Sequence, residues 1–247
     1  MDDGVDVPVA VLRMAHGPVN AMDIELCRAI AEQFRALVHD PARAIVITGT
    51  ERAFSAGVDL KRYLAGGESY VEEFLPALAD AFRAAFEVPK PVVAAVNGHA
   101  IAGGCVLAAC ADVVLMAAGR IGVPEIRVGV PFPRIALEVM RTAVGERTAR
   151  LLVMGAQTYD PERARELGLV DEVVAADALV ERAVAVARAM ASEVPPDTFA
   201  ITKTQLRRAA LDRTDRYADE DEEVARLWSR RATDGWTDAY LRAVTGR

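Results

Sequence analysis

The order of apolar and polar residues predicts short buried strands that alternate with amphipathic helices. Ala44–Thr48 and Val92–Val96 are almost wholly apolar, which is typical of strands buried on both faces of a parallel sheet. Between them, Asp23–Val38 carries apolar residues at helical spacing, and Asp40-Pro41 ends that segment. Strands separated by helices indicate an α/β fold.

Further strands and helices are expected along the same part of the chain. Strands are expected at Val5–Leu12, Asp112–Met116, Arg120–Val123 and Leu169–Val174, and helices at Ser69–Phe86, Gly103–Cys110, 132–143, 146–154 and 160–167. Pro76 is expected to kink or break its helix. Residues 49–60 are expected to form a Gly-rich and polar loop, and Asn97-Gly98 a turn.

The pattern changes after Ala176, where helical segments follow one another without a strand. The helices are expected at Ala176–Ser192, Pro196–Leu211 and Tyr217–Arg231. We therefore expect a core over residues 1–192 and a helical region over residues 193–247. Trp228 and Trp236 in that region are expected to serve either an interface or a local core.

Size and charge exclude several classes of protein. The chain has 247 residues, of which 52% are hydrophobic and 26% charged, so wholesale disorder is excluded. The formal net charge is −7. An acidic chain is a poor candidate for binding the phosphate backbone of a nucleic acid, so we expect no nucleic-acid partner.

Cysteine and histidine positions argue against disulfide and metal chemistry. Cys27, Cys105 and Cys110 form no paired motif, which favours a reducing, cytoplasmic location. The histidines are scattered, so no metal site is expected. The acidic start of the chain predicts no signal peptide, and no apolar stretch reaches about 18 residues, so no membrane span is expected.

Two loops carry the candidate chemistry. Ala53–Lys61 and Asn97–Cys105 each follow a buried strand and end in helix-like sequence. Small residues at such turns let backbone N–H groups point into open space, and a helix start adds partial positive charge. Side by side, the two turns would form an oxyanion hole. The alternative is two tight turns that pack closely because Gly and Ala fit there.

Other catalytic motifs are missing from these loops. Ser55 does not lie in a G-x-S-x-G motif, and Gly103-Gly104 lacks the surroundings of a dinucleotide or P-loop site. His16 and His99 are expected to be structural. Glu125, after Pro124, would ordinarily be a turn or cap residue, and it becomes a catalytic candidate if the fold directs it at the two loops.

Several segments, in this order and spacing, resemble the crotonase, or enoyl-CoA hydratase/isomerase, superfamily. They are Pro18–Met22, Phe54–Leu60, Pro91–Gly98, Ala102–Cys105, Ala111-Asp112, Pro124–Gly129, Gly168–Val174 and Phe199–Leu206. The resemblance covers nearly the whole chain. It implies a spiral core of ββα units and a C-terminal helical region that builds trimers, often paired into hexamers.

The resemblance also implies a ligand and a set of site residues. The ligand would be an acyl-CoA thioester, so coenzyme A would arrive as part of the substrate and no separate cofactor is expected. The backbone N–H groups of Ala56 and Gly103 would stabilise an enolate, with Glu125 as the catalytic acid and base. Substrate and CoA contacts would come from Ser55, Asp59, Leu60, Lys61, Gly104, Val106 and Phe132, and Lys61 and Arg62 would supply positive charge for the CoA phosphates.

One position departs from the pattern of the family's hydratases. Those enzymes use two glutamates, one of which lies three residues after the oxyanion glycine. That position is Val106 here, and Val cannot hold or deprotonate a water. Efficient hydration is therefore not expected.

A single glutamate is sufficient for a proton shuttle. Glu125 would take a proton from C2 of a 3-enoyl-CoA and return it at C4, aided by a dry pocket that raises the pKa of the carboxyl. The pattern thus resembles the 3,2-enoyl-CoA isomerase branch. Val130–Pro133 is expected to shape the acyl pocket, with Phe132 against the acyl chain.

Two alternatives stay open beside the isomerase. One is another crotonase-type reaction on an acyl-CoA, such as hydration, hydrolysis or decarboxylation. The other is a non-catalytic acyl-CoA binder, which would gain nothing from a buried Glu125. The dienoyl-CoA isomerase branch is set aside because its extra acid would fall at Pro133.

Overall fold

The computed structural model describes residues 7–50, 52–192 and 194–246. The strands are β1 (Val9–Arg13), β2 (Ala44–Thr48), β3 (Ala53–Ser55), β4 (Val92–Val96), β5 (His99–Ile101), β6 (Val113–Met116), β7 (Ile121–Gly122), β8 (Thr158–Tyr159) and β9 (Glu172–Val173). The helices are α1 (Ile24–His39), α2 (Leu60–Glu87), α3 (Gly103–Ala109), α4 (Glu125–Val128), α5 (Arg134–Gly155), α6 (Pro161–Glu166), α7 (Leu179–Ser192), α8 (Pro196–Arg216), α9 (Glu220–Arg231) and α10 (Trp236–Thr245).

The strands form two sheets that the chain visits in turn. A parallel sheet has the order β1-β2-β4-β6-β9, and a smaller sheet has the order β3-β5-β7-β8, in which β8 is antiparallel to β7. Three times the chain passes from a strand of the large sheet to a strand of the small one and then into a helix: β2-β3-α2, β4-β5-α3 and β6-β7-α4. This confirms the predicted α/β fold of repeated ββα units.

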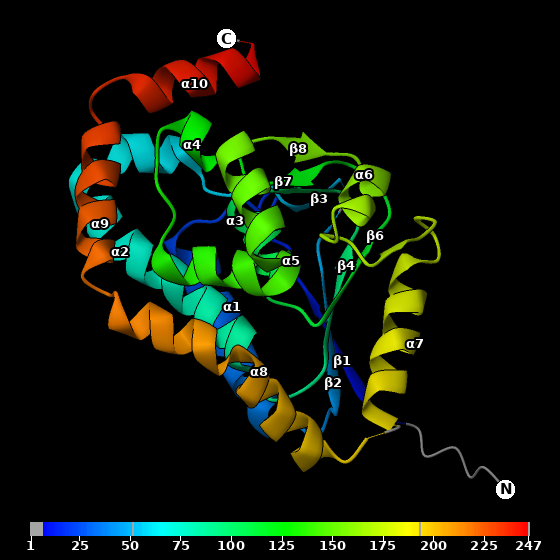
Figure 1. The fold of residues 1–247 in the computed structure, drawn as a ribbon. Coiled ribbons are helices and arrows are strands. Elements are labelled where there is room, and N and C mark those ends of the chain that lie inside the picture. Colours follow the sequence, from blue (N-terminus) through cyan, green and yellow to red (C-terminus); the bar gives the residue numbers. More distant parts are fainter. Residues whose placement is uncertain (1–6, 51, 193, 247) are drawn as a thin grey trace, which may run out of the picture.

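Burial on both faces explains why β2 and β4 are apolar throughout. On one face, Val46, Val93 and Leu115 pack against small alanines of α7, which lets that helix lie close to the sheet. The opposite face packs on α1, α2 and α3 in the main core. Figure 1 shows α7 on one side of the large sheet and the other helices gathered on its far side.

Two helices differ from their predicted bounds. Helix α2 begins at Leu60 because the Asp59 side chain accepts hydrogen bonds from the first amides, and it runs to Glu87. Its non-helical residue is Gly67 (φ 60°), so the predicted break at Pro76 is wrong. Helix α5 joins the two segments predicted at 132–143 and 146–154, with non-helical geometry at Gly145.

The elements that the sequence pattern missed are mostly short. Strands β3, β5 and β8 and helix α4 each span four residues or fewer, so no periodicity can reveal them. Residues 49–60 therefore contain a strand where only a loop was expected. Strand β9 is shorter than the predicted segment, and the strand predicted from Val5 begins at Val9, with residues 1–6 outside the described range.

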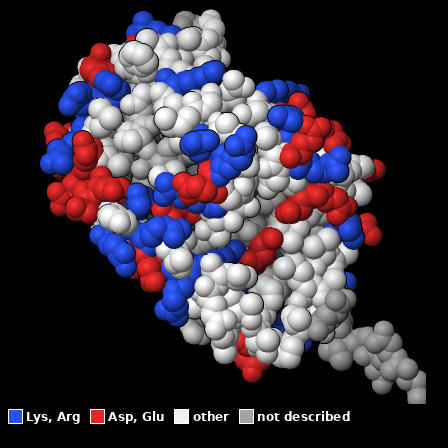
Figure 2. Space-filling view, in the orientation of Figure 1, with Lys and Arg blue, Asp and Glu red and all other residues white. Residues whose placement is uncertain are grey.

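The C-terminal helices wrap around the core without adding a strand. Helix α8 packs on α5, α9 on α2, and α10 on α4 (Figure 1). Trp228 is 2% exposed and belongs to the core, whereas Trp236 is exposed. In Figure 2, acidic side chains gather at the left, where α9 begins with Glu220–Glu223, and the surface over the first half of α8 carries few charges.

Candidate active site

A cavity of about 560 Å³ lies where the two sequence-predicted loops meet α4 and the C-terminal helices. Most of its lining is apolar. The lining residues are Pro18, Val19, Ala21, Ala56, Val58, Asp59, Leu60, Lys61, Ile101, Ala102, Pro124, Glu125, Val128, Val130, Trp228, Tyr240, Leu241, Val244 and Thr245. The fold therefore brings Glu125 to the two loops, which was the condition for treating it as a catalytic candidate.

Glu125 is a buried acid without a partner. It is the first residue of α4 and is 7% exposed, and its Oε2 accepts no hydrogen bond from the described residues. Burial disfavours the charged form and raises the pKa of the carboxyl to about 8. A carboxyl with that pKa exchanges a proton readily near neutral pH, so it can serve as both base and acid.

The first loop presents a free backbone donor at Val58. The Met22 N–H donates to the Gly57 carbonyl at 2.7 Å, and the Asp59 N–H donates to the Met22 carbonyl at 3.0 Å. In such a parallel bridge, the amide of the intervening Val58 points away from Met22. Val58 lines the cavity, and its N–H has no hydrogen-bond acceptor within the described chain.

The second loop presents a donor at Gly103, the first residue of α3. The Ala102 N–H donates a hydrogen bond to the Gly122 carbonyl. The Gly103 N–H, at the start of the helix, finds no acceptor among the described residues. A Cβ at Gly103 would lie 2.8 Å from the Met22 sulfur, so the position favours glycine.

The two loops are in direct contact. Gly57 has φ +80°, and a Cβ there would lie 2.5 Å from the Ile101 carbonyl oxygen and 2.9 Å from the Ala102 Cβ. Only glycine permits both this backbone conformation and this approach. The predicted side-by-side packing of the loops is therefore present, and it brings the residue before Val58 against the two residues before Gly103.

The structure corrects the prediction for Ala56. Its side chain lines the cavity, but its backbone N–H donates to the Val19 carbonyl at 3.0 Å and is not free to bind a substrate oxygen. Val58, two residues later, carries the available amide instead. The difference lies in a backbone hydrogen bond between distant segments, which the local sequence does not reveal.

The mouth of the cavity carries the predicted CoA-loop residues Asp59, Leu60 and Lys61. Asp59 Oδ1 accepts the N–H groups of Lys61 (3.0 Å) and Arg62 (3.1 Å), so this carboxylate caps α2. Lys61 is exposed and is the basic side chain among the described lining residues.

The positive charge predicted at Arg62 is neutralised. Its guanidinium donates to Asp23 and to Glu25, each at 2.6 Å. Asp23 Oδ2 also accepts a hydrogen bond from His16 Nε2 at 2.7 Å. Arg62 therefore joins α1 to α2, and Lys61 remains to attract an anionic ligand.

Four other predicted ligand residues lie behind the cavity wall. Ser55 is buried; its hydroxyl donates to the Asn20 carbonyl at 2.7 Å and accepts from the Gly57 N–H at 3.2 Å, so it shapes the first loop. A Cβ at Gly104 would lie 2.4 Å from the Ser55 carbonyl oxygen, so this glycine allows close packing. Val106 and Phe132 lie in the main core, and Val130 lines the cavity where Phe132 was expected.

The C-terminal helices supply lining residues that sequence reasoning missed. Trp228 comes from α9, and Tyr240, Leu241, Val244 and Thr245 come from α10. Burial raises the pKa of Tyr240, although Arg127 opposes the shift, and negative charge on Glu125 raises it further. No spacing rule connects these positions to residues 53–61, because packing of α9 and α10 against the core brings them there.

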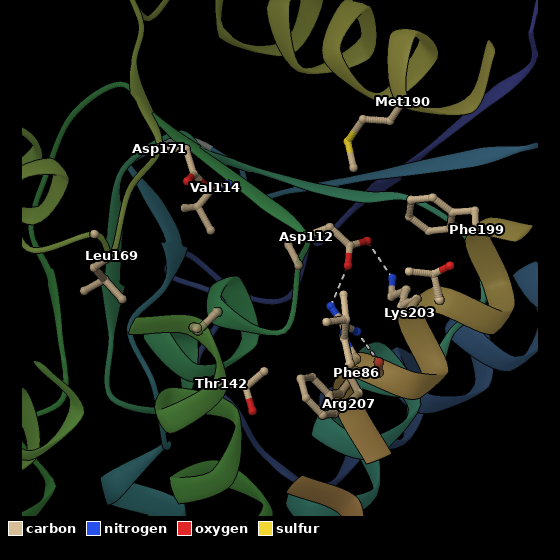
Figure 3. Close-up of a pocket in the computed structure, with 16 residues that line it drawn as sticks. Phe86, Asp112, Val114, Thr142, Leu169, Asp171, Met190, Phe199, Lys203 and Arg207 are labelled. Atoms are coloured by element: carbon tan, nitrogen blue, oxygen red, sulfur yellow. Dashed lines mark hydrogen bonds and ion pairs between the residues drawn. The ribbon is translucent and has the colours of Figure 1, made fainter. Parts of the chain in front are cut away.

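A second cavity, of about 370 Å³, lies where α8 meets the core. Figure 3 shows Asp112 between Lys203 and Arg207 of α8. Asp112 is 2.6 Å from each cation and also accepts the Val92 N–H at 2.8 Å. Burial lowers the pKa of Lys203 to about 8, with Asp112 opposing the shift. Arg207 also donates to the Phe86 and Cys110 carbonyls.

Metal and membrane features are not apparent in the described residues. Their His, Cys, Asp and Glu side chains include no group of three or more placed to hold a metal ion. The helices described include none with the length and hydropathy needed to cross a membrane. Cys27, Cys105 and Cys110 are buried and free.

The sequence is similar to a known protein family and to proteins named as enoyl-CoA hydratases. The family model for enoyl-CoA hydratase/isomerase matches residues 6–232. A probable enoyl-CoA hydratase of Rhizobium meliloti is 32% identical over 198 residues, which is 79% of this chain and 74% of the relative.

Two solved structures are also similar. An apo enoyl-CoA isomerase from Mtb has a TM-score of 0.78 and 32% identity, with 85% of this chain and 92% of that chain covered. Human mitochondrial delta3-delta2-enoyl-CoA isomerase has a TM-score of 0.86 over 97% of this chain and 95% of that chain. Its 22% identity supports a shared fold alone.

Proposed function

The chain belongs to the enoyl-CoA hydratase/isomerase family, and on that premise we propose that it is a 3,2-enoyl-CoA isomerase with Glu125 as its proton shuttle. The observation that carries the proposal is the unpartnered carboxyl of Glu125, with a pKa raised to about 8, in an apolar cavity that is also lined by Val58 with its free backbone amide. The Mtb relative at 32% identity is described as an enoyl-CoA isomerase in one solved structure and as a probable enoyl-CoA hydratase in another, so the proposal depends on the site rather than on this relative.

The proposed reaction moves one double bond and one proton. The ionised Glu125 carboxylate removes a proton from C2 of a 3-enoyl-CoA, and the electron pair delocalises over the thioester carbonyl and the C3=C4 bond. The protonated carboxyl then gives the proton to C4, and the double bond forms between C2 and C3. The product is a trans-2-enoyl-CoA, and the enzyme returns to its starting state.

The enolate formed after the first proton transfer needs stabilisation of its oxygen. Val58 lines the same cavity as Glu125, and Gly103 follows the lining residue Ala102; the N–H groups of both find no acceptor among the described residues. Gly103 adds the partial positive charge of the α3 start. Loss of one such donor typically costs about 10²–10³ in rate. We therefore assign the oxyanion hole to Val58 and Gly103 rather than to Ala56 and Gly103.

Binding of coenzyme A requires no separate cofactor in this proposal. The half-buried Leu60 and the exposed Lys61 lie at the mouth, where the ammonium of Lys61 would attract a CoA phosphate. The reacting acyl part would enter the apolar interior. The free, buried cysteines are consistent with a cytoplasmic location.

A second candidate function is hydration of a trans-2-enoyl-CoA. The similarity to a probable enoyl-CoA hydratase of Rhizobium meliloti favours it. Against it, Val106 is 1% exposed in the core and supplies no group to hold a water. Thioester hydrolysis, decarboxylation and non-catalytic acyl-CoA binding remain the further alternatives from the sequence, and a mere binder would not need the buried acid.

An assembly of three or six copies is part of the proposal. Large apolar side chains are exposed on α5 (Leu151 and Met154) and on α8 (Ile201 and Leu206). Exposed apolar surface on neighbouring helices is typical of protein–protein interfaces. The family resemblance implies trimers that often pair into hexamers, and we propose that these two helices contribute to such an interface.

The reaction is tested by the absorbance of the conjugated enoyl thioester. With a 3-enoyl-CoA, the isomerase produces a rise in absorbance, and a trans-2-enoyl-CoA produces no fall. Glu125→Gln removes the rise but still binds acyl-CoA. A fall with the trans-2-enoyl-CoA would show hydration and overturn the interpretation of Val106, whereas no change with either substrate would favour one of the remaining alternatives.

A further inference from the structure

The inner wall of the cavity is formed by Trp228. The indole is 2% exposed and lies beside Val128 and Val130, which are also buried. Behind it are Tyr63, with ring centroids 5.3 Å apart, and Phe74, at 6.1 Å. Both of these rings are fully buried, so the space behind Trp228 is filled by packed aromatic side chains.

Hydrogen bonds hold Trp228 in this position. Its Nε1–H donates to the Pro131 carbonyl at 2.9 Å, and its own carbonyl accepts the Tyr63 hydroxyl at 2.6 Å. The first bond ties α9 to the segment that follows Glu125, and the second ties it to α2. Rotation of the ring would break the indole hydrogen bond to Pro131, and the Tyr63 bond holds the backbone at the same residue, so the indole forms a rigid wall.

The lining residues are exposed at one end of the cavity and buried at the other. Lys61, Val19 and Val244 are exposed and belong to the mouth, whereas Val128, Val130 and Trp228 are buried. A thioester whose oxygen is held by Val58 and Gly103, and whose C2 faces Glu125, would direct its acyl chain from Glu125 towards this buried end.

From this geometry we propose that Trp228 limits the length of the acyl chain and that the substrates are short-chain acyl-CoA thioesters. The inference rests on the proposed function for the direction in which the thioester enters. Each methylene added to a short chain is buried in the apolar cavity, and a chain that reaches the indole has no further space. A longer acyl chain must either fold back inside the cavity or enter it less deeply, which leaves part of the cavity empty.

Binding of saturated acyl-CoA thioesters tests this limit without requiring turnover. Calorimetric titration of the wild-type protein with butanoyl-, hexanoyl-, octanoyl-, decanoyl- and dodecanoyl-CoA is expected to show an affinity maximum at octanoyl-CoA or shorter. Below the maximum, each buried methylene should tighten binding about fourfold. Affinity that keeps rising to dodecanoyl-CoA would mean that the chain leaves along α10, and it would overturn the proposal.

Substitutions of Trp228 test whether this residue sets the limit on acyl-chain length. Trp228→Ala should move the maximum to a longer chain, and Trp228→Phe, which keeps an aromatic ring in the cluster and is the safer variant for folding, should move it less. Val11→Ala is the control, because Val11 is exposed on β1 and lies outside the cavity lining. An unchanged maximum in folded Trp228→Phe and Trp228→Ala would refute the assignment.

The two proposals fail in different ways. Failure of the isomerase proposal appears as no absorbance change with any 3-enoyl-CoA, while the affinity maximum and its dependence on Trp228 persist. Failure of the length limit appears as normal isomerisation with no maximum in the acyl-CoA series.

Discussion

Two carboxylates, the buried Glu125 and the half-buried Asp112, lie in different cavities and differ in whether their charge is compensated. Asp112 faces two cations at 2.6 Å and accepts a backbone N–H, so its charge is compensated on every side (Figure 3). Glu125 is more deeply buried, but its Oε2 has no hydrogen-bond partner in the described chain. Burial alone therefore does not mark a catalytic group; burial without compensation does.

The two arrangements have different energetic consequences. The ion pairs of Asp112 join Lys203 and Arg207 of α8 to the start of β6, and removal of one partner would leave buried charges without compensation. The site of Glu125 costs stability whenever the carboxyl is ionised. That cost persists in the fold because it gives the acid a pKa suited to proton transfer.

Replacing each carboxylate by the corresponding amide sharpens this comparison. The largest expected effect is that of Glu125→Gln. Gln keeps the shape of the side chain but cannot accept a proton from carbon. We expect turnover of a 3-enoyl-CoA to fall by about 10²–10⁴-fold, with the protein still folded. The measurement is the initial rate of absorbance change, with circular dichroism as the control for folding. Near-normal turnover would assign the proton transfer to another group.

Asp112→Asn is expected to change stability rather than chemistry. Loss of the carboxylate charge leaves Lys203 and Arg207 buried without a counterion, which typically costs about 3–5 kcal/mol. Urea unfolding followed by tryptophan fluorescence measures the difference from the wild type. If the variant were as stable as the wild type, Asp112 would not be needed to compensate the two cations.

The smallest expected effect is the pH dependence of stability caused by Glu125. Its folded pKa of about 8 lies above the ordinary value of 4.5, so the unfolded chain loses this proton first as pH rises. The free energy of unfolding therefore falls as pH rises between these two pKa values. The expected decrease between about pH 6 and about pH 8 is about 2 kcal/mol.

The Glu125→Gln variant is the control for that pH effect. Its free energy of unfolding should lack this decrease, so the difference between variant and wild type should grow with pH. A difference that stays constant from about pH 6 to about pH 8 would contradict the raised pKa of Glu125.

Most of the core was predictable because local sequence and tertiary burial agree there. The apolar runs at β2 and β4 and the amphipathic pattern of α1 each predict the element that forms. The short strands were not predicted, because a strand of two or three residues is stable only through its neighbours. Helix α10 was also missed.

The candidate site was predictable only in part. The loop sequences and Pro124-Glu125 identified the segments that meet, and the resemblance to a family identified the chemistry. The choice of Val58 over Ala56 depends on the hydrogen bonds of residues 19 and 22 to the first loop. Phe132 and Arg62 were assigned to the ligand from sequence position, but packing in the core and pairing with Asp23 and Glu25 occupy them.

The sequence by itself determined the α/β architecture, the two small-residue loops and the absence of a second glutamate at Val106, because these follow from residue type and spacing. The tertiary structure decided which amides are free, which acid is left without a partner and which C-terminal side chain ends the cavity. Glu125 and Asp112 are both acids beside apolar residues in the sequence. Only the packing of α8 brings Lys203 and Arg207 to one of them and leaves the other uncompensated.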